Sequence, residues 1–215
     1  MQEHHLRVPR SARYFTLGGG SRGVAEVWFV CHGYGQLASR FVQKFEVLAD
    51  GRRLILAPEG LSRFYVDEPH QKVGASWMTR EDRLTEIEDY VRYLDALCAE
   101  VFRTLPRAGV RVSALGFSQG AATVCRWATL GMSRVDRLIV WGGEVPPDLD
   151  LPAVADRLRA LRLWLVYGRH DEFFTPKVIA TTEARLRDHG IPYDLVPFDG
   201  GHEIDPTVLT ELAGA

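Results

Sequence analysis

Three residues whose types can together activate a nucleophile follow predicted strands, in the order Ser118, Asp171 and His202. A histidine can take the proton of a serine hydroxyl near neutral pH and later deliver it to a leaving group. A carboxylate fixes the orientation of the imidazole and stabilises its charged form. The chemistry that this set could perform is two-step acyl transfer.

The serine lies in a Gly-x-Ser-x-Gly turn, from Gly116 to Gly120, between a predicted strand and a predicted helix. In such a turn the residues two before and two after the serine nearly touch, and only glycine lacks the Cβ that would clash. The turn raises the Ser118 hydroxyl above the sheet at the positive end of the helix, where negative charge is stabilised. An ordinary glycine-rich turn with a surface serine is the alternative interpretation.

Acyl transfer also needs N–H donors for the oxyanion of its tetrahedral intermediate, each worth roughly 3–4 kcal/mol. The backbone N–H groups of Gln119, at the start of the helix, and of Tyr34, after His32-Gly33, are the predicted donors. We expect His32 to brace this loop rather than to catalyse, with an ordinary packed histidine as the alternative.

Other groups near the predicted acid and base could be confused with them. Asp199 is a rival acid close to His202, but Asp171 is preferred because it follows a well-formed strand. His170 and Glu172 flank Asp171 and receive no catalytic role.

Composition limits the class of protein. With 215 residues, 46% of them hydrophobic, the chain predicts one globular domain. The net charge of −2 gives no indication of a nucleic-acid partner or an anionic membrane surface. No apolar run approaches the roughly 20 residues that span a bilayer, so we expect no stable membrane insertion. The N-terminus lacks an apolar signal core, which predicts a cytoplasmic protein.

The sequence offers no evidence for a metal or an organic cofactor. We find no paired histidine or carboxylate spacing of the kind that binds metals. Cys31, Cys98 and Cys125 show no C-x-x-C spacing and lie in apolar patterns, so they are predicted to be buried free thiols. Gly18 to Gly23 match the dinucleotide fingerprint formally, but a strand rather than a helix follows. We therefore predict a hairpin turn there.

Predicted strands alternate with predicted helices along the chain, which indicates an α/β fold with a mostly parallel twisted sheet and helices on both faces. A long irregular loop is expected at 58–78. The longest helix is expected from Thr79 to Leu105, with an apolar stripe beginning at Leu84. The expected strands are 13–17, 24–31, 54–57, 110–115, 138–141, 163–167 and 193–198, and the other expected helices are 37–48, 119–130, 152–161, 176–189 and one after 204.

Four segments in this order make the chain resemble the phospholipase/carboxylesterase family of α/β-hydrolases, which includes acyl-protein thioesterases. They are Phe29 to Gly35, Gly116 to Gly120, Gly168 to Asp171 and Gly200 to Ile204. The order serine, acid, histidine is also that of α/β-hydrolases. The resemblance covers about residues 24–213.

The resemblance implies the catalytic triad Ser118, Asp171 and His202, and it implies oxyanion donors at Tyr34 and Gln119. It also implies hydrolysis of esters or thioesters without a cofactor, often by a homodimer. Family members commonly carry Leu where Tyr34 stands and Asp where Gln36 stands, which changes the side chains around the acyl pocket.

These observations predict a serine hydrolase of short or medium acyl esters, thioesters or lysophospholipids. A hydrolase of the same fold that acts on sugar-linked or aromatic acyl esters is one alternative, and a non-catalytic binding scaffold is another. Several large side chains are candidates for the substrate pocket, with ordinary core packing as the alternative: Phe64, Trp77, Met78, Phe173 and Phe174.

Overall fold

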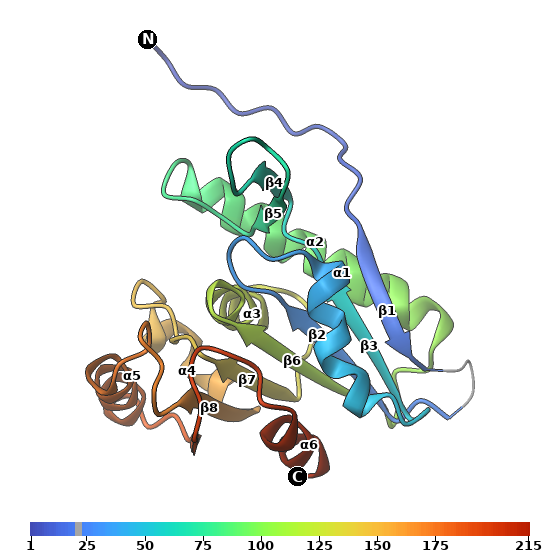
Figure 1. Cartoon of the computed structure of the whole chain (residues 1–215), viewed down its shortest axis with the longest axis vertical. Helices are drawn as coiled ribbons and strands as arrows, with labels where there is room; N and C mark the ends of the chain where they lie inside the picture. The colour runs from blue at the N-terminus through green and yellow to red at the C-terminus, as the bar shows by residue number, and fades with distance from the viewer. Residues whose placement is uncertain (20–22) are drawn as a thin grey trace.

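The computed structural model describes residues 1–19 and 23–215. Within these residues the main sheet has seven strands in the order β1-β3-β2-β6-β7-β8-β9 (Figure 1). β1 is antiparallel to β3, and every other pair is parallel. The strands are β1 Tyr14–Gly18, β2 Glu26–Cys31, β3 Arg53–Pro58, β6 Arg111–Phe117, β7 Arg137–Trp141, β8 Arg162–Gly168 and β9 Asp194–Phe198.

Helices cover both faces of this sheet, so the predicted fold class is confirmed. Strand β2 is buried along its whole length because alternate side chains enter two different cores: Val27 and Phe29 pack with the α2 side, and Trp28 and Val30 pack with the α6 side. The helical elements are α1 Ala38–Phe41, the 3₁₀ helix η1 Val42–Leu48, α2 Arg83–Thr104, α3 Gln119–Leu130, α4 Leu151–Arg159, α5 Pro176–Asp188 and α6 Pro206–Gly214.

The prediction of an irregular loop throughout 58–78 is wrong in part, because two segments of it form a second, two-stranded sheet. Its antiparallel strands are β4 Ser62–Tyr65 and β5 Val73–Ser76. Each strand has only four residues and pairs with no strand of the main sheet, so its alternation is too short to stand out in the sequence.

The glycine-rich segment does not join a β1–β2 hairpin. β3 lies between β1 and β2 in the sheet, so the predicted hairpin is wrong. The centre of the predicted turn, residues 20–22, lies outside the described residues. A strand, β2, follows the segment, as predicted, whereas a dinucleotide-binding turn would be followed by a helix.

Two helix predictions differ in detail. The helical segment after Leu37 becomes a 3₁₀ helix from Val42 onward. Leu84 lies in the first turn of α2 and is 69% exposed, so the buried stripe starts one turn later, at Ile87.

The three cysteines are free and buried, as predicted. Burial raises the pKa of the Cys125 thiol to about 12, so this group remains protonated at neutral pH. In the described part of the chain, no helix combines the length and apolar character needed to cross a membrane.

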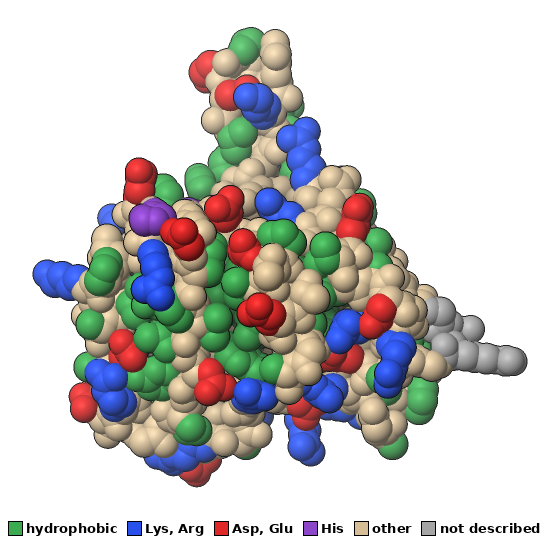
Figure 2. Space-filling view, turned by 60° about the horizontal axis from the view of Figure 1, so that its bottom comes forward, with side chains coloured by type: hydrophobic (Ala, Val, Ile, Leu, Met, Phe, Trp, Pro, Cys, Tyr) green, Lys and Arg blue, Asp and Glu red, His purple; other side chains and the backbone are tan. Residues whose placement is uncertain are grey.

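Charged side chains of both signs are intermixed over the face seen in Figure 2. The chain before β1 is an extended N-terminal arm without a helix or strand (Figure 1), and its first eleven residues are exposed.

Candidate active site

The serine occupies a sharp turn between β6 and α3. Ser118 has φ 55° and ψ −116°, a strained conformation for a residue with a side chain. A Cβ on Gly116 would lie 2.0 Å from the carbonyl oxygen of Gly120, and a Cβ on Gly120 would lie 2.1 Å from that of Cys31. Only glycine fits at either position, as predicted for this turn, because any Cβ would clash with the backbone.

Asp171 and His202 are brought together from the ends of β8 and β9. The Nδ1 of His202 lies 2.7 Å from the Oδ2 of Asp171, whose side chain is 1% exposed. The other carboxylate oxygen accepts the backbone N–H groups of Phe173 at 2.9 Å and Phe174 at 3.0 Å. An ionised carboxylate accepts hydrogen bonds only, so Nδ1–H is the donor and Nε2 is left as the acceptor.

The imidazole of His202 lies next to the turn that holds the serine. Its ring centroid is 4.6 Å from that of Phe117, the residue before Ser118. Gly142, which follows β7 with φ 52°, makes room for it, since a Cβ there would lie 3.2 Å from both Cε1 and Nδ1 of His202. Sequence reasoning did not select Gly142, although the Gly-Gly pair directly after a strand was a usable signal.

Among the described residues, no hydrogen bond joins the Ser118 hydroxyl to His202. Such bonds are often long or poorly aligned before a substrate binds.

The rival acid makes a different contact. Asp199 lies 2.9 Å from Nε2 of His170, and both side chains are exposed to solvent. The carboxylate in contact with His202 is therefore Asp171.

Tyr34 and Gln119 each offer an unoccupied backbone N–H at the same edge of the sheet. In residues 1–19 and 23–215, neither N–H has a hydrogen-bond acceptor. Gln119 opens α3, whose N-terminal end carries partial positive charge. The Tyr34 loop is braced by Gln36, whose Oε1 accepts the Gly33 N–H at 2.9 Å, a role that the sequence did not reveal.

His32 is wholly buried beneath this loop and makes hydrogen bonds with both ring nitrogens. The Gly60 N–H donates to its Nε2 at 3.0 Å, so Nδ1 carries the proton and donates to the Gly33 carbonyl at 2.8 Å. Burial lowers the pKa of His32, opposed by the Gly33 bond and the charge of Glu59. A neutral histidine in this position braces the loop, which is the role predicted for it.

The five pocket candidates occupy two different settings. The rings of Phe173 and Phe174 lie 4.9 Å and 5.9 Å from that of His202, and Phe173 is 68% exposed. Phe64 lies 5.1 Å from the ring of Tyr34.

Trp77 and Met78, by contrast, lie below the surface of the site. Trp77 is in the core and donates its indole N–H to the His32 carbonyl. Met78 is partly buried, and its sulfur accepts a hydrogen bond from Arg126. Neither of these two contacts involves Ser118 or His202.

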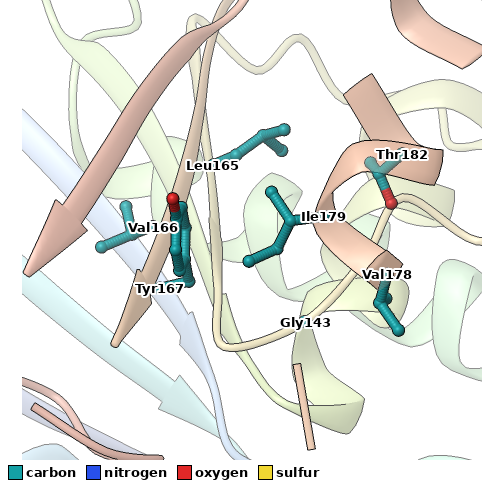
Figure 3. A pocket seen from close by; sticks show the side chains of 7 residues that line it. All are labelled: Gly143, Leu165, Val166, Tyr167, Val178, Ile179 and Thr182. Carbon is teal, nitrogen blue, oxygen red and sulfur yellow. The ribbon is translucent and has the colours of Figure 1, made fainter. Parts of the chain in front are cut away.

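A small cavity of about 10 Å³ lies between β8 and α5 (Figure 3). Ile179 of α5 points toward the β8 side chains across it. The lining residues are mostly apolar and include none of the candidate acid, base or nucleophile: Gly143, Leu165, Val166, Tyr167, Val178, Ile179 and Thr182. It is a packing defect rather than a substrate site.

One group of possible metal ligands occurs elsewhere in the described residues. Glu3, His5 and Asp82 bring one ligand atom each within 4.8 Å of one another, and all three are exposed. The contacts of His5 with the two carboxylates, at 3.3 Å and 2.9 Å, explain the arrangement as surface ion pairing.

Between 95% and 97% of the chain can be superposed on each of three solved structures. Zea mays acyl-protein thioesterase 2 has a TM-score of 0.74 at 19% identity, over 95% of this chain and 97% of that chain. A carboxylesterase from Mesorhizobium loti has a TM-score of 0.70 at 21% identity, over 95% of each chain. A phospholipase/carboxylesterase from Dyadobacter fermentans has a TM-score of 0.68 at 16% identity, over 97% of this chain and 98% of that chain.

The chain has an α/β-hydrolase fold. Its structural neighbours include esterases and an acyl-protein thioesterase, and they also include a protein of unknown function from Agrobacterium tumefaciens. No family model matches the chain. No curated protein matches it significantly in sequence. The chain is therefore similar to its neighbours in architecture, and its chemistry has to be argued from its own residues.

Proposed function

We propose that the protein is a serine hydrolase that cleaves carboxylic esters or thioesters through an acyl-enzyme intermediate. One observation carries the proposal: the buried, fully hydrogen-bonded Asp171 holds His202 at 2.7 Å, and the imidazole packs on the residue before Ser118. A buried carboxylate in contact with a histidine, next to the turn that holds a strained serine, supports activation of Ser118 as the nucleophile.

In the proposed reaction the Ser118 oxygen attacks the substrate carbonyl while its proton passes to Nε2 of His202. Asp171 stabilises the imidazolium that results. The carbonyl oxygen becomes an oxyanion, which accepts hydrogen bonds from the Tyr34 and Gln119 N–H groups. His202 then protonates the departing alcohol or thiol. A water molecule, deprotonated by the same imidazole, attacks the acyl carbon. The bond from that carbon to the Ser118 oxygen breaks as His202 returns the proton to this oxygen, and the acid is released.

The substrates proposed are short or medium acyl esters, thioesters and lysophospholipids. The proposed reaction needs no metal or organic cofactor, because the side chains supply both the nucleophile and the proton carrier. A cytoplasmic location and a homodimer, expected from the N-terminus and from the family resemblance, stay predictions.

Aromatic acyl esters are a second candidate class, favoured by the rings at the site. Phe173 and Phe174 flank His202 on one side, and Tyr34 with Phe64 forms a ring pair at the other loop. Such pairs can hold a flat acyl group by offset or edge contacts worth about 0.5–1.5 kcal/mol each.

The test is turnover of p-nitrophenyl acetate, butyrate, octanoate, palmitate and benzoate by the wild type and Ser118→Ala. We expect the wild type to turn over at least one ester and Ser118→Ala to lose at least about a thousandfold in rate. The profile across the five esters separates aliphatic from aromatic preference. Equal rates for both proteins would refute Ser118 as nucleophile, and failure of an organophosphonate to label the wild type would favour the non-catalytic scaffold.

A further inference from the structure

The two candidate oxyanion donors lie on different elements, which the pairing of β2 with β6 joins only as far as Cys31 and Gly116, so contacts beyond the strand ends also bear on the distance between the donors. Gln119 opens α3, whereas Tyr34 lies in the loop after β2. A shift of one element by about 1 Å would move one donor out of hydrogen-bond range of a shared oxygen. The small β4–β5 sheet is in contact with both elements.

On one side, β5 is hydrogen-bonded to the Tyr34 loop. The Gly35 N–H donates to the Ala75 carbonyl at 2.9 Å, and the Ala75 N–H donates to the Gln36 carbonyl at 3.1 Å. The backbones are in close approach here, since a Cβ on Gly74 would lie 2.4 Å from the Gly35 carbonyl oxygen. The loop therefore cannot move without β5.

On the other side, the end of β5 is bound by the side chain of Gln119. Its Oε1 accepts the Trp77 backbone N–H at 3.0 Å. Its Nε2 donates to the Met78 carbonyl at 2.8 Å and to the Ser76 hydroxyl at 3.1 Å. The oxygen and the nitrogen of one side-chain amide thus make hydrogen bonds with the last residue of β5 and with the two residues that follow it.

We propose that the Gln119 side chain is a positioning group for the oxyanion hole. Its hydrogen bonds connect the end of β5 to the turn that holds Ser118, and the hydrogen bonds of Ala75 connect β5 to the Tyr34 loop. Together these bonds keep the distance between the Tyr34 and Gln119 N–H groups constant. The inference rests on the proposed function for its catalytic consequence, but the physical connection can be tested without it. Ser118, Asp171 and His202 take no part in this connection.

The test replaces the amide and leaves the backbone N–H of residue 119 in place. Gln119→Met keeps about the same length and removes every hydrogen bond of the side chain. Gln119→Asn keeps the amide but withdraws it by one methylene, and it serves as the second variant if Gln119→Met does not fold. Gln43→Met, at an exposed glutamine of η1, is the matched control.

Hydrogen exchange is the first readout. In Gln119→Met, the amides of Gly35 and Ala75 are expected to exchange at least about tenfold faster than in the wild type and in Gln43→Met. The same change is expected in Gln119→Asn. Exchange within twofold of the wild type at both amides would overturn the proposal, whatever the protein catalyses.

Kinetics is the second readout, expressed per active site titrated with an organophosphonate. We expect kcat to fall about 10- to 100-fold with KM within about threefold, and the affinity for a trifluoromethyl ketone to fall in the same proportion. Unchanged kcat per titrated site would limit the amide to a structural role and overturn the proposal. A wild type without turnover, but with the expected exchange, would instead refute the proposed function and leave the connection standing.

Discussion

Asp171 is the residue whose environment defines the candidate site most sharply. One oxygen accepts two backbone N–H groups and the other contacts His202, so the carboxylate cannot rotate without breaking several bonds at once. Asp171→Asn should keep the bonds to Phe173 and Phe174 but present an NH₂ group to Nδ1. The imidazole would then carry its proton on Nε2, where it cannot accept one from Ser118. We expect kcat to fall about 10⁴-fold in ester hydrolysis assays.

Asp199→Asn is the matched control, because Asp199 is exposed and paired with His170. Its kcat should stay within about twofold of the wild type. A large loss in Asp199→Asn with little loss in Asp171→Asn would reverse the assignment of the acid.

His32 makes stability depend on pH. Burial lowers its folded-state pKa below the ordinary value of 6.5, so below pH 6.5 the unfolded chain binds a proton that the folded one does not. Its contribution to stability is therefore complete above pH 6.5 and is lost as the pH falls toward the folded pKa. The slope is at most about 1.4 kcal/mol per pH unit.

Urea unfolding of the wild type and His32→Gln between pH 8 and pH 5 measures this contribution. We expect His32→Gln to be less stable at pH 8, because the bonds to Gly33 and Gly60 are altered, and to show a shallower decline below pH 6.5. Parallel curves would mean that another group accounts for the pH dependence.

At the scale of elements, the turn after β7 determines whether His202 can reach the nucleophile turn. Gly142→Ala puts a Cβ 3.2 Å from two imidazole atoms and also strains the backbone at φ 52°. The strain alone costs about 1–2 kcal/mol. We expect an additional loss of at least about tenfold in kcat, because the imidazole is displaced.

Gly51→Ala separates the two effects. Gly51 has φ 81°, and a Cβ there would meet nothing within 4 Å. It should lose stability by a similar amount and keep its kcat. If both variants lose activity equally, the effect of Gly142→Ala comes from strain rather than from contact with His202.

The elements that the sequence predicted well are those whose pattern is local. The buried strands β6, β7 and β8 are apolar runs bounded by polar or glycine residues, and Ser118 lies in a turn that only glycine neighbours allow. The strand that pairs with β1 could not be predicted, because the alternating pattern of β1 does not distinguish pairing with β2 from pairing with β3. The contact of β5 with Gly35 could not be predicted either, because its hydrogen bond joins backbone atoms that every residue has.

Within the site, the sequence predicted residue types but not their surroundings. It placed Ser118, Asp171 and His202 after predicted strands. Because parallel strands end at one edge of a sheet, it predicted that these three residues lie near one another. It left open whether Trp77 lines the pocket or lies in the core, since a tryptophan in a loop and one beneath it have the same local pattern, and the structure places it in the core. How far a side chain such as Trp77 is exposed depends on how the helices and the sheets pack together, which a local sequence pattern does not contain.

At the scale of the whole molecule, the exposed N-terminal arm contacts the body through surface pairs, and the contact with a buried group comes just after it, at Arg13. His5 of the arm lies 2.9 Å from Asp82. Arg7 pairs with Glu88 on the surface, and such pairs are worth about 0–1 kcal/mol. Arg13 instead makes two bonds, at 2.6 Å and 3.0 Å, to Glu59, whose side chain is 2% exposed. Glu59 also accepts the Ala38 N–H at the start of α1.

Arg13→Met should therefore destabilise the protein more than removal of the arm before it. With Arg13 gone, Arg63 at 3.4 Å is the remaining cation on the buried carboxylate of Glu59. We expect a loss of about 1–3 kcal/mol, or a fall in Tm of about 2–12 °C by calorimetry. Deletion of residues 2–10 and Arg10→Met, the matched arginine control, should each change Tm by less than about 2 °C. A larger fall on deletion than in Arg13→Met would show that the exposed arm, rather than the Glu59 contact, stabilises this edge of the sheet.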